Sequence, residues 1–139
     1  MKRCLGLDLG TKTLGVATSD RLGIIASPYK TIKFNNIDDA IKEVLNIIKE
    51  KDIGEIALGL PLNMDNSRGF ASSRSLDFKD KLEKVCDIPI TLVDERLSTV
   101  EAENYLLKED MSRKKRKEVI DAVAASVILN TYIRMKGNK

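Results

Sequence analysis

Apolar and polar positions in the first 34 residues predict three short strands. An apolar run over residues 4–9 ends at Gly10, as expected of a buried strand. Small and apolar residues over 13–19 predict a second strand, and a turn leads into a third over 24–34. The short connections favour antiparallel pairing. Pro28 cannot donate to a strand ladder, so the third strand is expected at a sheet edge or with a bulge.

From residue 35 onward, the pattern alternates between helices and strands. Apolar residues recur with helical spacing over 38–51, which predicts an amphipathic helix. Short apolar runs predict a fourth strand over 55–60 and a fifth over 90–93. Further helices are expected over 68–85, capped by Asn66 or Ser67, over 99–109, capped by Ser98, and over 118–135, where apolar positions cover most of the circumference.

This order of elements predicts an α/β fold with a mixed five-stranded sheet. The first three strands are antiparallel. The later strands are separated by helices and join in parallel through right-handed crossovers, which puts helices on both faces of the sheet. The length of 139 residues fits a single domain over 1–139.

Composition narrows the possible chemistry. The chain has no histidine, which excludes Ser-His-Asp and Cys-His nucleophile systems and HExxH zinc sites. Catalysis would have to use carboxylates, lysines, hydroxyls or metals with oxygen ligands. The two cysteines give neither a disulfide framework nor metal-ligand spacing, and no apolar run approaches membrane-spanning length. We therefore expect a soluble cytoplasmic protein that contacts no membrane.

The positive charge is small in total but unevenly distributed. The net charge is +3, from 24 Lys and Arg against 21 Asp and Glu. The long run of like charge consists of Arg113, Lys114, Lys115, Arg116 and Lys117. Such a run repels itself unless a polyanion or solvent accommodates it. A nucleic-acid contact and a solvated loop between two helices are both compatible with it.

Asp8 is the first candidate for a functional residue. It stands near the end of an apolar strand, where an isolated buried carboxylate would neutralise unless it were paired, hydrogen-bonded or bound to a metal. The structural alternative is a strand-end aspartate that accepts backbone N–H groups of the turn over residues 10–12.

Two further acidic positions share this setting. Asp94 and Glu95 end the fifth strand, and Asp121 lies in the apolar last helix. If the first, fourth and fifth strands are parallel, Asp8 and the Asp94–Glu95 pair lie at one edge of the sheet, where open α/β sheets bind ligands. The alternative is a set of unrelated structural carboxylates, one of them paired with Lys114 or Lys117.

Crowded carboxylates repel one another unless cations neutralise them. Mg²⁺ and Mn²⁺ suit oxygen ligands and keep waters and substrate phosphates in their coordination shell. Two such ions, about 3.5–4 Å apart, can activate a water molecule and stabilise the leaving oxygen of a phosphodiester. This chemistry requires no histidine, so the acidic residues favour a metal-dependent nuclease with two ions.

Four sequence motifs carry a family resemblance over essentially the whole chain. They are Asp8-Leu-Gly10-Thr-Lys12 with Gly15, GLPLNMDNS at 59–67, VDERLST at 93–99 and DAVAASVIL at 121–129. Together they resemble the YqgF/RuvX-type pre-16S rRNA nucleases, relatives of bacterial Holliday-junction resolvases in the ribonuclease H-like superfamily. The chain departs from the family pattern at Thr13, where a second basic residue is common, and at Asn66, where glycine is common.

The resemblance implies a ribonuclease H-like domain that matures the 5′ end of 16S rRNA with a carboxylate-held metal site. If the metal ligands of the family are transferred to the matching positions of this sequence, Asp8 is the ligand on the first strand and Asp121 the ligand on the last helix. The middle ligand is Asp94 or Glu95. The alternation of a strand sends Asp94 and Glu95 to opposite faces, so one of the two is expected to reach the metals. Lys12 and Arg96 would hold phosphates or balance the carboxylates, and the basic run over 113–117 would contact nucleic acid.

Other functions are also compatible with these residues. Cleavage of four-way DNA junctions uses the same metal chemistry as trimming of structured RNA. Asp8-Leu-Gly10-Thr-Lys12 also resembles the first phosphate-binding turn of actin-like and sugar kinases, but these need two lobes around the nucleotide. A non-catalytic rRNA-binding module would gain nothing from carboxylates beside its basic residues. We expect pre-rRNA as the partner, structured DNA as the alternative, and a monomer or weak homodimer.

Overall fold

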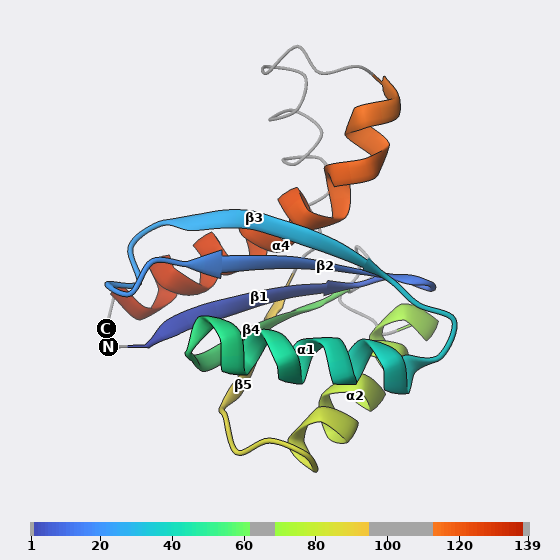
Figure 1. Ribbon diagram of the computed structural model, residues 1–139, viewed down its shortest axis with the longest axis horizontal. Coiled ribbons are helices and arrows are strands. Elements are labelled where there is room, and N and C mark those ends of the chain that lie inside the picture. The colour runs from blue at the N-terminus through green and yellow to red at the C-terminus, as the bar shows by residue number, and fades with distance from the viewer. Residues whose placement is uncertain (1, 62–68, 95–112, 138–139) are drawn as a thin grey trace.

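The computed structural model describes residues 2–61, 69–94 and 113–137. The elements, in chain order, are β1 (Arg3–Leu9), β2 (Thr13–Ser19), β3 (Ala26–Lys33), α1 (Ile37–Lys51), β4 (Ile53–Leu60), α2 (Phe70–Glu83), β5 (Ile90–Asp94) and α4 (Arg113–Gly137). Figure 1 shows these elements along the chain. All five predicted strands are present, and β2 has the predicted bounds.

The five strands form one mixed sheet in the order β3-β2-β1-β4-β5. β1 pairs antiparallel with β2 and parallel with β4, β2 pairs antiparallel with β3, and β4 pairs parallel with β5. The predicted sheet is therefore confirmed. Because β1, β4 and β5 are parallel, their carboxyl ends meet at one edge of the sheet.

Helices cover both faces of the sheet. In Figure 1, α1 and α2 lie on one side and α4 lies on the other. Alternate residues of β1 enter different cores: Leu5 and Leu7 pack toward α1 and α2, whereas Cys4 packs with Leu129 and Tyr132 of α4. This alternation assigns the even-numbered positions of β1 to the α4 face.

β3 is an edge strand and begins later than predicted. The Asp20 carboxylate accepts hydrogen bonds from the backbone N–H groups of Ile24 and Ile25, at 2.8 and 3.1 Å, so these residues belong to the turn. The prediction for Pro28 is confirmed, because the strand lies at the edge of the sheet and its pairing with β2 shifts register between Lys30 and Pro28.

The helices differ from the predictions at their ends. α2 begins at Phe70 with Gly69 as its N-cap and no side-chain cap, so the predicted cap at Asn66 or Ser67 is wrong. α4 begins at Arg113, which places the basic run 113–117 within helical backbone instead of a loop. Lysine and arginine are good helix formers, and no glycine or proline interrupts this stretch. The predicted helix over 99–109 and its cap Ser98 lie outside the described residues.

None of the helices in the described part of the chain is both long and apolar enough to cross a membrane.

Candidate active site at the carboxyl edge of the sheet

Asp8 projects from β1 toward the face that α4 covers. It is half-buried and pairs directly with Gly15 of β2 in the antiparallel ladder. Residues directly opposite each other in such a ladder project to the same face. A Cβ on Gly15 would point at the backbone of α4, so the Asp8 side chain shares that direction.

The backbone of Asp121 lies against Gly15. An ideal Cβ at Gly15 would stand 1.9 Å from the Asp121 carbonyl oxygen and 3.0 Å from the backbone nitrogen of Ala122. Only a residue without a Cβ allows this approach. Asp8, Gly15 and Asp121 therefore form one neighbourhood, in which the strand pair carries one carboxylate and the helix brings the other.

A second glycine brings α4 onto the sheet one turn further along. A Cβ at Gly6 would stand 2.7 Å from the carbonyl oxygen of Ala125 and 2.8 Å from the Cβ of Leu129. Gly6 and Gly15 are both buried in the sheet. α4 thus touches the strand backbone along its middle, where Ala122 and Ala125 are buried small residues. The pair of glycines fixes the height of the helix above the sheet.

Asp94 lies at the same edge but on the other face by strand alternation. Gly59 pairs with Val93, and Leu60 pairs with Asp94. Val93 packs in the core beneath α4, so the next residue projects toward the α1 and α2 side. Asp94 is exposed, and its position separates it from the face on which Asp8 lies. Glu95 and Arg96, also predicted for the site, lie outside the described residues.

The turn after β1 places Lys12 at the same edge. The backbone N–H of Gly10 donates to the Thr13 carbonyl at 2.7 Å, and that of Phe34 donates to the Lys12 carbonyl at 3.0 Å. These two bonds hold the turn between β1 and β2 against the end of β3. Lys12 is exposed, as a phosphate-contacting residue requires. Because α4 begins at Arg113 instead of the predicted residue 118, Asp121 lies about two turns into the helix.

Metal ligation is compatible with the donors found here, but the described residues do not complete a site. Within residues 2–61, 69–94 and 113–137, no three Asp, Glu, Cys or His side chains gather as a metal-binding group. Asp8 and Asp121 supply carboxylate oxygens, the donor type that Mg²⁺ and Mn²⁺ prefer. A third carboxylate from outside these ranges would be needed for the predicted set.

Gly15 is the site residue whose role the sequence reasoning missed, although it stood in the first motif. The signal was available in the run of small residues over 13–19, since small residues in a strand often mark the close approach of another backbone. Position 15 could not be tied to residue 121 from the sequence, because more than 100 residues separate them and their contact depends on how α4 crosses the sheet.

A separate polar network lies at the opposite end of β1. Glu55 of β4 accepts hydrogen bonds from the Cys4 thiol at 2.9 Å, from the Tyr132 hydroxyl at 3.1 Å and from the Lys136 ammonium. Burial by itself would raise the pKa of Glu55, but these hydrogen bonds lower it below its ordinary value. Burial, and then the bond to the Glu55 carboxylate, raises the pKa of Cys4 to about 11. The network fastens the end of α4 to β1 and β4.

Solved structures with the same arrangement define the fold. The RuvC resolvase of T. thermophilus in complex with a Holliday junction substrate has a TM-score of 0.61 to this chain at 13% identity, covering 99% of this chain and 96% of that one. The fowlpox virus resolvase with Holliday junction DNA has a TM-score of 0.60 at 10% identity, covering 96% and 98%. The fold is therefore the ribonuclease H-like fold of RuvC-type resolvases.

Sequence comparison places the chain more narrowly. The pattern of the RuvX family, described as Holliday junction resolvase, matches residues 2–135, and the chain belongs to this family. Proteins called "Putative pre-16S rRNA nuclease" are similar to it. The one from Oceanobacillus iheyensis is 46% identical, covering 96% of this chain and 99% of the relative, and the one from Ruegeria sp. is 50% identical, covering 93% and 82%. The chain is accordingly a nuclease, a hydrolase of phosphodiester bonds.

Proposed function

We propose that this chain is a divalent-metal-dependent nuclease that trims the 5′ end of precursor 16S rRNA. The observation that supports the proposal is the contact of the Asp121 backbone with Gly15, directly opposite Asp8, because it brings two aspartates from distant parts of the chain close together on one face of the sheet. The similarity to proteins named as pre-16S rRNA nucleases supports the choice of RNA.

In this proposal, Asp8, Asp121 and one carboxylate of the Asp94–Glu95 pair hold one or two Mg²⁺ or Mn²⁺ ions. The bound ions would supply an activated water and charge stabilisation for the leaving oxygen. The glycine at position 15 keeps the α4 backbone close to β2, so that the separation of Asp8 and Asp121 stays fixed. Lys12, on the turn that follows Asp8, holds a substrate phosphate and offsets the negative charge of the carboxylates.

We infer that Glu95 is the middle ligand in preference to Asp94. Val93 faces α4, and Asp94 follows it on the opposite side of the strand. Continued alternation would return residue 95 to the face of Asp8. Arg96 and the basic run 113–117 then serve as contacts for the nucleic-acid backbone, a role that rests on their charge and on the family resemblance.

A second candidate substrate is branched DNA. The family description, Holliday junction resolvase, favours it, and the same metal chemistry would cleave either polymer.

We further propose that the chain works in the cytoplasm as a single domain, monomeric or weakly dimeric. Light scattering over a range of concentrations would contradict this assignment if it returned a stable higher oligomer.

The test compares a pre-16S rRNA 5′ leader with a synthetic four-way DNA junction. We expect Mg²⁺- or Mn²⁺-dependent cleavage of the leader, lost in EDTA and in Asp8→Asn and Asp121→Asn. Each substitution should cost more than the roughly 10–100-fold typical of an outer-shell metal partner. Thermal stabilisation of the wild type by Mn²⁺, absent from Asp8→Asn, would report binding independently of activity. Undiminished cleavage in excess EDTA would overturn the metal mechanism.

A further inference from the structure

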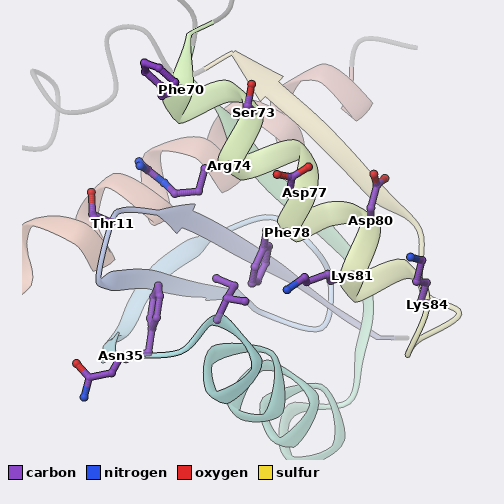
Figure 2. Close-up of a pocket in the computed structure, with 12 residues that line it drawn as sticks. Thr11, Asn35, Phe70, Ser73, Arg74, Asp77, Phe78, Asp80, Lys81 and Lys84 are labelled. Carbon is purple, nitrogen blue, oxygen red and sulfur yellow. The ribbon is translucent and has the colours of Figure 1, made fainter.

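The hollow between α2 and the turn that follows Asp8 contains the side chain of Arg74. The hollow has a volume of about 730 Å³, and its lining includes Thr11, Phe34, Arg74 and Lys81. Figure 2 shows Arg74 and Lys81 extending from α2 into it, Arg74 toward the side on which Thr11 lies. No pattern in the sequence singled out Arg74.

The Nε of Arg74 is a buried hydrogen-bond donor without an acceptor among the described residues. Asp77 is one helical turn away, yet the described residues contain no ion pair between the two. A shielded Nε without an acceptor costs free energy, whereas Arg74 as a whole is only half-buried, so that a ligand in the hollow can approach the rest of the guanidinium. The planar fork of arginine matches a phosphate, which can accept two of these bonds at once.

The helix that carries Arg74 is fixed against the sheet. Ser72 donates a hydrogen bond from its hydroxyl to the carbonyl of Pro61, which directly follows β4. Phe78 and Leu82 on the same helix are buried in the core beneath α1 and α2. The backbone position of Arg74 is therefore set by the fold, as a binding residue requires.

The hollow continues toward the candidate active site. A neighbouring hollow of about 420 Å³ is lined by Lys12 and Lys33 and shares Phe34 and Asn35 with the first. Lys33 pairs with Thr13 in the sheet, directly beside the turn that carries Lys12. Basic residues line both hollows, together with Asp77 and Asp80 in the first and Asp39 in the second. The remaining surplus of positive charge runs along the carboxyl edge of the sheet, which suits the repeated charges of a polyanion better than one small anion.

We propose that Arg74 binds a phosphodiester of the substrate strand, away from the scissile bond. The strand would leave Asp8 on the α4 face, cross the turn over residues 10–12, and place a phosphate in the hollow on the α2 face. This inference rests on the proposed nuclease function and adds Arg74 as a substrate-binding residue. Lys81 is a weaker candidate, because its ammonium already lies 3.9 Å from the Asp38 carboxylate.

The test measures binding without cleavage. In the Asp8→Asn background, the affinity for a fluorescent single-stranded RNA and for a four-way DNA junction is titrated against salt. Arg74→Gln should weaken RNA binding and reduce the slope of log affinity against log salt by about 0.7, the value for one single-strand phosphate that is no longer neutralised. Arg74→Lys should keep the slope but not the full affinity, because it retains the charge and loses the fork.

The matched control is Lys79→Gln, which removes the same charge from the same helix at a residue already paired with Glu83 at 3.0 Å. It should leave the slope unchanged. Arg74→Gln should not lower the midpoint of thermal unfolding, since the Arg74 Nε has no acceptor among the described residues. An unchanged slope for Arg74→Gln, or an equal change for Lys79→Gln, would overturn the inference. Binding is measured apart from cleavage. If the leader is not cleaved, the proposed function is refuted, but the effect of Arg74→Gln on RNA binding can still be interpreted.

A second arm separates a strand phosphate from a free anion. Inorganic phosphate or a mononucleotide is added at the same concentration at which the RNA saturates the protein. Neither should displace the RNA or raise the midpoint of thermal unfolding. Tight binding of either, abolished by Arg74→Gln, would assign the hollow to a small anion and overturn the assignment to the substrate strand.

Discussion

The carbonyl group of Asp121 lies so close to Gly15 that a methyl group at position 15 would stand 1.9 Å from its oxygen. Gly15 is paired with Asp8, so this one contact sets the spacing between the two acidic residues proposed to hold metal. We predict that Gly15→Ala forces α4 away from β2. The clash is with backbone, which cannot rotate aside, so the free energy of unfolding should fall by about 1–3 kcal/mol or more, and cleavage should be lost.

Gly137→Ala is the control for Gly15→Ala. A Cβ there meets nothing within 4 Å, and the residue ends the same helix. Denaturant unfolding and leader cleavage should both be unchanged in this variant. Wild-type activity in Gly15→Ala would contradict the assignment of Asp8 and Asp121 to a common site.

The two neighbouring acids at the end of β5 should behave differently. Asp94 follows Val93, which faces α4, so its side chain lies on the face away from Asp8. We predict that Asp94→Asn keeps most of the metal-dependent cleavage, whereas Glu95→Gln loses it along with the stabilisation by Mn²⁺. The measurement is initial cleavage rate against Mn²⁺ concentration for both variants. The reverse order of effects would assign the metal to Asp94.

The basic run at the start of α4 should contribute to nucleic-acid binding. Replacing residues 113–117 by glutamine keeps good helix formers in a helical stretch, so circular dichroism should be unchanged. Binding to RNA should weaken, and its salt dependence should flatten by about 0.7 in log–log slope for each single-strand phosphate that the variant no longer neutralises. The same affinity and slope as the parent would show that the run serves as a solvated helix end.

The charge of Glu55 should stabilise the fold fully above the ordinary pKa of a glutamate, and progressively less as the pH falls below it. The pKa of Glu55 is lowered in the folded protein, so its contribution is present above the unfolded value near 4.5 and is lost as the pH falls through the folded value. We predict that Glu55→Gln lowers the free energy of unfolding by about 1.5–3 kcal/mol at pH 7, the range for hydrogen bonds to a charged group, and by less at pH 3, which lies below the ordinary pKa of a glutamate.

Glu83→Gln is the matched control for this pH profile. Glu83 belongs to an exposed pair with Lys79, so the change should cost less than about 1 kcal/mol at either pH. If Glu55→Gln and the wild type differ by the same amount at pH 7 and pH 3, the charge of Glu55 does not contribute, and the network acts through packing. Urea unfolding at the two pH values distinguishes these outcomes.

Much of the fold could be predicted because the sequence carries a local signal for each element. β2 was predicted with its observed bounds, and the other strands were found with small shifts at their ends. Errors arose where a local signal was ambiguous. Asn66 and Ser67 are good capping residues, yet Gly69 is the cap of α2, and the charge of the run 113–117 suggested a loop although its residues favour a helix.

The candidate site was predictable in part. Asp8 and Asp121 could be singled out, because a carboxylate in an apolar strand or helix needs an explanation. The role of Gly15 and the shielded Nε of Arg74 could not be predicted, because both depend on which segments pack against each other. The roles of Asp8, Asp121, Glu95 and Lys12 stay predictions, as does the single domain over 1–139.

The amino-acid pattern alone is enough to predict the described strands, the sheet they form and the acidic residues that are candidates for holding a cation, since periodicity and the cost of burying charge are properties of short segments. Only the tertiary structure decided that α4 contacts the backbone of β2 at Gly15 and that Asp94 lies on the face away from Asp8. The physical reason is that such contacts join residues far apart in the chain. They are fixed by the height and crossing of a helix over a sheet, which no local pattern encodes.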